Sequence, residues 1–358
     1  MLVATRLPLT PTAERLINLW TERYTPDTQN FSQDSRSTIR RELHKLSTKR
    51  ERANTIAKFT ERSMAQHCKI AAVRTKELYA NLDDGMALQE AAHLAKSAAV
   101  IYMKLFEFYR SFPSADASLS ALPDSTLNAA NKTVGSALAL ASGGSILHLA
   151  ETIEPLLLAF QAEHLKSKDW RTLGFITTQI NFTNQLLLEQ LTSLERIWLA
   201  PYFSFLEEQV ALPWQRVCAV AAEHNEQSPA FVAVEQLMAQ STPISRRVYR
   251  SLGKRFGSHY SRRGRFDTPA IEHSCLRDLD MFQAYLWLCL LQENQKPLEE
   301  ELQPLCEQVF DSVRITPALV SSATQSLSRE IIQRLSPSQQ ALVSPYCEAM
   351  VDTFSQDA

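Results

Sequence analysis

The amino-acid sequence predicts an all-α fold, and three observations support this prediction. Over long stretches, apolar residues recur at spacings of three and four, which is the pattern of amphipathic helices. Strand-type alternation of apolar and polar residues is almost absent. Glycine is also scarce, with 8 among 358 residues. A chain of this length favours two domains, and its 45% apolar residues are enough for hydrophobic cores.

The composition also excludes several classes of protein. A formal net charge of -2 excludes a globally basic nucleic-acid binder. The six cysteines are scattered without a Cys-x-x-Cys pair, which argues against a disulfide framework or a zinc site. The first residues lack the apolar core of a signal peptide, and no apolar run approaches the length that spans a bilayer. We therefore expect a soluble cytoplasmic protein.

Long helices are predicted for the N-terminal part of the chain. The first covers residues 7–24, with Thr10 or Thr12 as its N-cap and Pro11 near its start. A second helical pattern runs without interruption through residues 34–79 and stops at "NLDDG". A third helix covers residues 86–112 and ends before a proline.

A further long helix is predicted over residues 169–209. It should bend near Pro201, because a proline inside a helix removes a backbone hydrogen bond. After Pro213 the predicted helices become shorter and turn signals more frequent. These features place a boundary between a helical domain of unknown role, residues 1–195, and a second domain, residues 196–358.

Motifs for catalysis or metal binding were sought along the whole chain. Glu90 and His93 have the Glu-x-x-His spacing of carboxylate-bridged di-iron proteins. Such a site needs the motif twice, and it occurs once, so we interpret the two residues as a surface pair and predict no metal site. The sequence also lacks a P-loop, a Gly-x-Ser-x-Gly, a His-Glu-x-x-His and a dinucleotide fingerprint. It therefore predicts no enzyme and no catalytic residue.

The stretch from residue 246 to residue 265 is strongly basic and contains no acidic residue. Such uniform charge indicates an anionic partner: a phosphate backbone, an acidic protein surface or a ligand carboxylate. The alternative is a solvated segment that binds nothing. In either case the charges are expected to be exposed and to contribute little to stability. The candidate partner-binding residues are Arg246, Arg247, Arg250, Arg262, Arg263 and Arg265, with Lys254 and Arg255 in the same stretch.

The stretch "HSCLRDLDMFQAYLWLCLL", residues 273–291, joins a polar opening to an apolar run. Cys275, Arg277 and Asp278 lie together at the expected start of a helix. One interpretation assigns these residues no function: the aspartate complements the helix dipole, the arginine reaches water and the cysteine packs as a small apolar group. Cys275 and Asp278 are three residues apart and should share one helical face, and a thiolate is favoured at a helix start. Cys289, deeper in the same helix, should be a core residue.

From about residue 205 onward the sequence resembles the phycobiliproteins, the globin-like light-harvesting subunits of cyanobacteria and red algae. "RRVYRSLGKRF" is similar to a helix of the family with the pattern Val-Tyr-x-x-Phe, and a polar, arginine-containing loop follows it. "SCLRDLDMFQAYLWLCLL" resembles the long central helix, which opens with Cys-x-Arg-Asp. "PLEEELQPLCEQVFDSVRITPALVSSATQSLSREI" and "LSPSQQALVSPYCEAMVDTFS" resemble the last three helices. The resemblance covers residues 205–358 and leaves residues 1–185 unassigned.

The resemblance implies a globin-like domain and a covalently bound linear tetrapyrrole, or bilin. In the family the cysteine holds the bilin through a thioether, the arginine pairs with a propionate and the aspartate accepts hydrogen bonds from pyrrole N–H groups. Carried over, these roles fall on Cys275, Arg277 and Asp278. Their chemistry suits the roles, because charge-assisted hydrogen bonds to carboxylates are strong and a guanidinium matches a carboxylate geometrically.

Three departures from the family's pattern affect this bilin site. Ser274 occupies a position that is commonly basic, Ala318 and Leu319 replace an expected aromatic pair, and "QENQKP" replaces a short glycine turn. These changes remove a propionate contact and aromatic walls of the pocket. Two alternatives therefore stay open: a bilin on Cys275, or a globin-like fold that has lost its bilin.

The resemblance implies a non-enzymatic protein of the phycobilisome, the light-harvesting assembly, as a bilin-binding accessory, assembly or regulatory subunit. The alternative is a bilin-free regulatory scaffold that binds an acidic protein or nucleic acid through the basic stretch. A bilin lyase or isomerase comes third. Family members pair through apolar helical faces, so we expect a helical partner such as a phycobilisome subunit, a homo- or heterodimer, and an association with the thylakoid. Nucleic acid is the less favoured partner.

Overall fold

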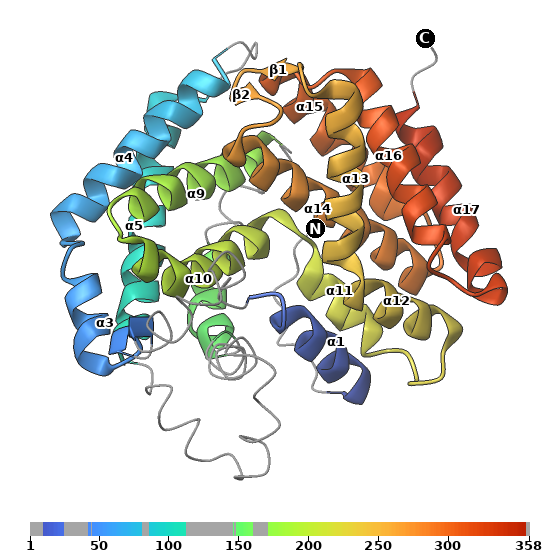
Figure 1. Cartoon of the computed structure of the whole chain (residues 1–358), viewed down its shortest axis with the longest axis horizontal. Coiled ribbons are helices and arrows are strands. Elements are labelled where there is room, and N and C mark those ends of the chain that lie inside the picture. Colours follow the sequence, from blue (N-terminus) through green and yellow to red (C-terminus); the bar gives the residue numbers. More distant parts are fainter. Residues whose placement is uncertain are drawn as a thin grey trace.

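The computed structural model describes residues 10–24, 42–43, 45–80, 86–111, 146, 148–159 and 171–355. In this part of the chain the fold is all-α, as the sequence predicts (Figure 1). The described β structure is one antiparallel hairpin, β1 (Tyr260–Ser261) with β2 (Gly264–Arg265). No helix of the described residues is long and apolar enough to cross a membrane.

The first helix, α1 (Pro11–Thr21), begins as predicted. The Thr10 hydroxyl accepts a hydrogen bond from the backbone N–H of Ala13 at 3.3 Å, and Pro11 occupies the first helical position. A proline there loses no hydrogen bond, because the first N–H groups of a helix have no partner within it. The cap predicted at Thr10 or Thr12 is therefore Thr10.

The uninterrupted helix predicted over residues 34–79 is wrong in its described part. This part contains two separate helices, α3 (Lys49–Ile56) and α4 (Glu61–Leu78), and residues 42–43 and 45–46 are helical before a turn at residues 47–48. Residues 34–41 and residue 44 lie outside the described residues. Thr60 caps α4 by accepting from the Ser63 N–H at 3.1 Å. A threonine hydroxyl that caps one helix ends the preceding one, because the N-cap residue has non-helical backbone angles. The third predicted helix is confirmed as α5 (Leu88–Ser111).

The long helix predicted over residues 169–209 is also two helices, α9 (Arg171–Glu189) and α10 (Ser193–Ala211). The interruption lies at Thr192, and Pro201 is accommodated inside α10. Thr192 and Glu195 form a capping box, in which each side chain accepts a hydrogen bond from the other residue's backbone. The boundary between α9 and α10 therefore lies at this capping box and not at Pro201.

The shortening of the helices predicted after Pro213 is wrong, because α14, with 24 residues, is as long as α5. Helix α14 is central to this part of the chain and packs against α10, α11, α12, α13 and α17 (Figure 1). The elements are α11 (Trp214–Ala221), α12 (Pro229–Ala239), α13 (Ser241–Phe256), α14 (Pro269–Gln292), the π-helical turn η3 (Pro297–Leu302), α15 (Gln303–Val313), α16 (Pro317–Ile332) and α17 (Pro337–Phe354).

One connected set of buried apolar side chains extends from Leu16 to Phe354. Helix α1 belongs to it by packing on α11 and α12, where Trp20 stacks on Trp214 with ring centroids 5.9 Å apart. Helices α4, α5 and α9 pack on one another, and α9 and α10 join them to α14 and α15. The domain boundary near residue 195 stays a prediction. It falls within α10, a helix that contacts both α9 and α14.

Candidate functional site

Helix α14 carries Cys275, Arg277 and Asp278, but not at its start. The helix begins at Pro269, so Cys275 lies in the second turn and the expected helix-start position is wrong. The three residues line one cavity of about 120 Å³ between α14, α15, α16 and the β1–β2 hairpin. Its walls are mainly apolar and include Phe266, Phe282, Val309, Phe310, Ile315, Leu319 and Val320, with Tyr79 from α4 and Thr178 from α9.

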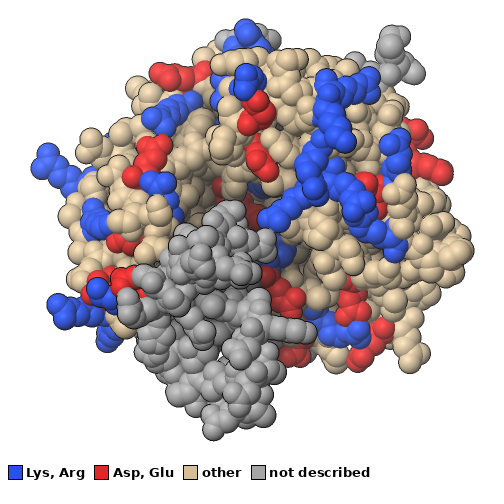
Figure 2. All heavy atoms as spheres, viewed as in Figure 1, with Lys and Arg blue, Asp and Glu red and all other residues tan. Residues whose placement is uncertain are grey.

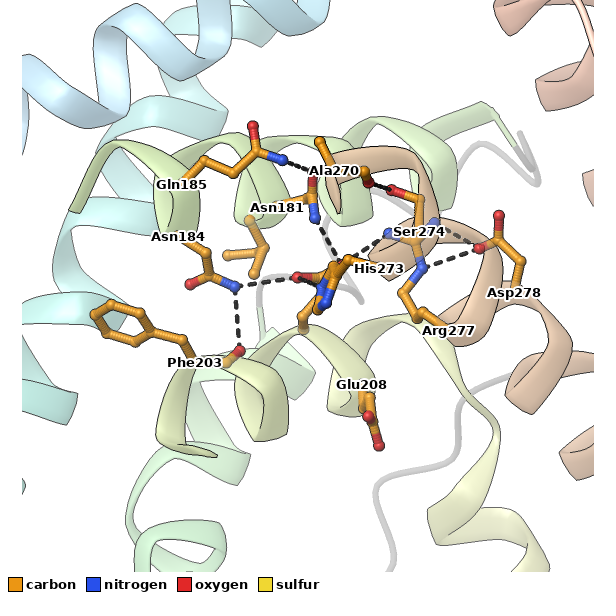
Figure 3. Close-up of polar contacts among 12 residues, drawn as sticks. Asn181, Asn184, Gln185, Phe203, Glu208, Ala270, His273, Ser274, Arg277 and Asp278 are labelled. Carbon is orange, nitrogen blue, oxygen red and sulfur yellow. Dashed lines mark hydrogen bonds and ion pairs between the residues drawn. The ribbon is translucent and has the colours of Figure 1, made fainter. Parts of the chain in front are cut away.

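The Arg277 guanidinium is held by two carboxylates of this chain (Figure 3). Its Nη1 donates to Glu207 Oε1 at 2.8 Å, and its Nε donates to Asp278 Oδ1 at 2.9 Å. Glu207 comes from α10, and its side chain is only 1% exposed. The pair therefore lies in the interior, where removing one partner would leave a buried charge uncompensated.

Glu207 is satisfied by further donors. Asn181 Nδ2 donates to its Oε1 at 2.9 Å, and Asn184 Nδ2 to its Oε2 at 3.2 Å. His273 Nε2 lies 3.1 Å from Oε2, with the imidazole 46% exposed. Burial by itself raises the pKa of Glu207, but His273 and Arg277 outweigh burial and hold the pKa well below its usual value. Glu207 in turn raises the pKa of His273, so both groups are stabilised in their charged forms.

Arg263 reaches the same cluster from the hairpin. Its Nη1 donates to Ser274 Oγ at 2.8 Å, its Nη2 contacts Asn181 Oδ1, and its guanidinium lies 5.1 Å from the ring centre of Phe182. Burial lowers the pKa of Arg263, and the nearby Arg277 lowers it further. The cation of Arg263 thus lies beside Ser274, the position that is commonly basic in the phycobiliproteins. The expectation that this arginine is an exposed loop charge is wrong.

Cys275 does not have the environment of a reactive thiol. Burial raises the pKa of Cys275 well above its usual value, and the neighbouring Asp278 raises it further. The thiolate expected at a helix start is therefore disfavoured, since the thiol lies inside the helix between apolar walls. Cys275 is partly exposed, whereas Cys289 is fully buried in the core, as predicted.

The basic stretch divides into two parts in the structure. On α13, Arg246, Arg250 and Lys254 are four residues apart and follow one exposed line, with Arg247 and Arg255 beside them. Figure 2 shows these side chains as a continuous stripe, which we call the α13 basic face. Its described acidic neighbour is Glu330, 3.6 Å from Arg247 Nε.

The hairpin arginines have partners within the chain. Arg262 Nη1 donates to the carbonyl of Leu78 at 2.9 Å, and Arg265 pairs with Asp267, with an Nε–Oδ1 distance of 2.5 Å. Arg263 is half-buried and donates to Ser274 and Asn181, as described above. Of the six predicted partner-binding residues, the structure therefore brings Arg246, Arg247 and Arg250 together on one surface and places Arg262, Arg263 and Arg265 elsewhere.

Several residues of the cluster were not predicted from the sequence. Glu207 is the most important, with Asn181, Asn184 and Tyr102, whose hydroxyl donates to Asn184 Oδ1 at 2.6 Å. The sequence does contain one indication: "FSFLEEQVAL", residues 203–212, places two glutamates inside an apolar run. A buried carboxylate requires a cation, and Arg277 is that cation. Across the described residues, no group of three or more His, Cys, Asp or Glu side chains could hold a metal ion.

The cavity at Cys275 does not fit a linear tetrapyrrole in this arrangement. Sites for drug-sized ligands have volumes of about 300–1,000 Å³, and this cavity has about 120 Å³. The guanidinium that would pair with a propionate is already paired with Glu207 and Asp278. Two carboxylates of the chain thus already compensate the charge of Arg277.

Comparison with protein families assigns the C-terminal region. Residues 216–354, from α11 to the end of α17, match the model of the phycobilisome protein family. Searches among curated proteins and among solved structures found no match. The match includes α14 with Cys275, Arg277 and Asp278, and it leaves α1 to α10, with Glu207, outside. Residues 216–354 are therefore similar to the phycobilisome proteins and are all-α in the structure, as the resemblance predicted for the C-terminal part.

Proposed function

We propose that this protein is a non-catalytic component of the phycobilisome system that acts by binding another protein and carries no bilin. The observation that carries the proposal is the buried pair between Glu207 and Arg277. It connects a helix outside the family match to the arginine that, in the family, pairs with a bilin propionate. The pocket's polar corner then stabilises the fold instead of binding a ligand.

Energetics favours this assignment. A buried ion pair compensates the desolvation of its charges only when hydrogen bonds satisfy the remaining atoms. Glu207 meets this condition through Asn181, Asn184 and His273. A ligand carboxylate would have to displace Glu207 from Arg277 and leave it buried without its guanidinium. Breaking such a pair costs about 3–5 kcal/mol, which would subtract directly from the ligand's affinity.

The α13 basic face is the proposed partner-binding surface. Its five cations lie on an exposed helix face, and only Arg247 has a described carboxylate within 4 Å. The line from Arg246 to Lys254 is about 12 Å long, at a helical rise of about 1.5 Å per residue. That length suits a short acidic helix or loop. An acidic protein surface is favoured over nucleic acid, because the chain as a whole carries a net charge of -2.

Co-sedimentation with phycobilisomes isolated from the native host tests the partner. The variant Arg250→Glu/Lys254→Glu should lose binding, whereas Lys49→Glu/Arg50→Glu, an equal charge change on exposed residues of α3, should retain it. Wild-type binding should weaken as salt rises, because exposed charges are screened. Equal binding by both variants would refute the α13 basic face as the contact surface.

The absorption spectrum of the protein purified from its native host tests the absence of a bilin. The expected result is absorption by the aromatic side chains alone, with no visible band.

The second candidate function is that of a bilin-carrying subunit with the chromophore on Cys275. One observation favours it: Cys275, Arg277 and Asp278 line the same cavity. A visible band that the variant Cys275→Ala lacks would establish this candidate and reject the bilin-free proposal.

A further inference from the structure

A second, larger cavity lies on the other side of α14 from Cys275. It has a volume of about 400 Å³ and lies between α10, α13 and α14, with Arg23 and Tyr24, which follow α1, at one end. Arg277 is the one residue that lines both cavities. Its charged lining residues besides Arg277 are Arg23, Arg196, Glu208, Arg246, His273 and Asp280.

The two carboxylates that line this cavity are satisfied by the protein itself. Arg23 Nη2 contacts Asp280 Oδ2 and lies 3.7 Å from Glu208 Oε1. Ser245 Oγ donates to Asp280 Oδ1 at 2.6 Å, and the Tyr24 hydroxyl donates to Glu208 Oε2 at 2.7 Å. Neither carboxylate therefore requires a cation from a ligand.

Three further cationic groups line the cavity from three different helices. Arg196 on α10 and Arg246 on α13 are exposed, and neither forms an ion pair with a described residue. Arg196 Nε donates to the carbonyl of Leu191 at 3.0 Å, which holds the side chain in place. His273 on α14 adds a third positive charge when protonated, which Glu207 favours.

The N-terminal end of α13 adds to this positive potential. Thr242, in its first turn, lines the cavity, and Gln240 makes no side-chain capping hydrogen bond. The first turn of a helix carries a partial positive charge and favours anions. Figure 2 shows the α13 basic face running toward the centre of this view. Arg246 is shared by the α13 basic face and the lining of the cavity.

We infer that this cavity binds a small organic anion with two or more carboxylate or phosphate groups. Its volume lies within the range of about 300–1,000 Å³ that small-molecule sites occupy. Arg196 and Arg246 approach from different helices, so two separate anionic groups match them better than one does. Guanidinium groups suit this ligand class, because they bind carboxylate and phosphate through paired hydrogen bonds. The inference is independent of the proposed phycobilisome partner.

Isothermal titration calorimetry on the full chain tests the inference, with citrate and inorganic phosphate as probes. Citrate should bind more tightly than phosphate. Arg246→Gln and Arg196→Gln should each weaken citrate binding by about ten- to a hundredfold, as expected for one lost charge-assisted contact. Ala200→Trp should abolish binding by filling the cavity without changing its charge.

Lys254→Gln is the matched control, because it removes the same charge from α13 two turns beyond Arg246 and does not line the cavity. It should leave citrate affinity unchanged. In a thermal-unfolding control, sodium chloride at the same ionic strength should not reproduce the stabilisation that citrate gives. No heat of binding with either probe would overturn the inference. Equal citrate affinity in wild type, Arg246→Gln and Ala200→Trp, each shown by circular dichroism to be folded, would overturn it as well.

Discussion

Arginines of one short sequence stretch have opposite environments in this protein. Arg263 is half-buried beside Phe182 and donates to Ser274 and Asn181, whereas Arg250, on the α13 basic face, is exposed. In the sequence both belong to one basic run without acidic residues. The difference shows that uniform charge along the chain does not establish a binding surface. Tertiary partners decide which cations stabilise the fold and which remain available to a ligand.

Removing the carboxylate of Glu207 should have the largest effect. Glu207→Ala leaves Arg277 without its buried partner, so the free energy of unfolding should fall by about 3–5 kcal/mol. Urea unfolding measures this change. The exposed Glu223→Ala serves as control and should stay within about 0.5 kcal/mol of wild type. A similar small change for Glu207→Ala would mean that the pair does not support the fold.

Arg263→Gln removes the guanidinium that has hydrogen-bond partners within the chain. We expect a smaller loss of stability than for Glu207→Ala. Losing the contacts to Ser274 and Asn181 should lower the free energy of unfolding by about 1.5–3 kcal/mol, the contribution typical of hydrogen bonds to a charged group. The same urea experiment measures it. If Arg263→Gln were as stable as wild type, the guanidinium would behave as the exposed loop charge that its sequence context suggests.

The pH dependence of stability should report the contact between His273 and Glu207. The pKa of His273 is raised in the folded state, so its contribution is complete below the unfolded value of about 6.5 and declines as pH rises through the folded value. Because the imidazole is 46% exposed, this contribution should remain below about 1 kcal/mol. Urea midpoints measured from about pH 6 upward should therefore fall in wild type more than in His273→Asn. An identical decline in both proteins would contradict the contact.

Removing exposed cations of the α13 basic face should have the smallest effect on stability. Arg250→Ala and Lys254→Ala should each change the free energy of unfolding by less than about 0.5 kcal/mol, because solvated surface charges contribute little. Thermal unfolding of the two variants measures this. A loss above about 2 kcal/mol for either variant would mean that the side chain stabilises the fold, as we expect for Arg263.

Local sequence was sufficient for part of the fold. The pair Thr10–Pro11 predicted the start of α1, and helical periodicity predicted the all-α class. The sequence also indicates the break at Thr192, because Thr-x-x-Glu is a capping-box pattern. Pro201 is the more conspicuous signal, but it does not interrupt α10. Proline is tolerated inside α10, whereas the hydroxyl and carboxylate caps act at the helix ends.

The candidate site depends on contacts that no local pattern contains. The family resemblance identified Cys275, Arg277 and Asp278, and these residues do share a cavity. Their chemical state was not predictable, because it depends on Glu207, 70 residues earlier in the chain. The raised pKa of Cys275 likewise results from burial in tertiary structure, whereas its sequence neighbours alone suggested a reactive thiol.

We propose that Glu207 takes the place of a ligand carboxylate at Arg277, so that Cys275 carries no bilin. The most direct test is mass spectrometry of the tryptic peptide that contains Cys275, from protein purified from its native host. This peptide should have the mass of the unmodified sequence at full occupancy. A peptide whose mass is increased by that of a linear tetrapyrrole would refute the proposal.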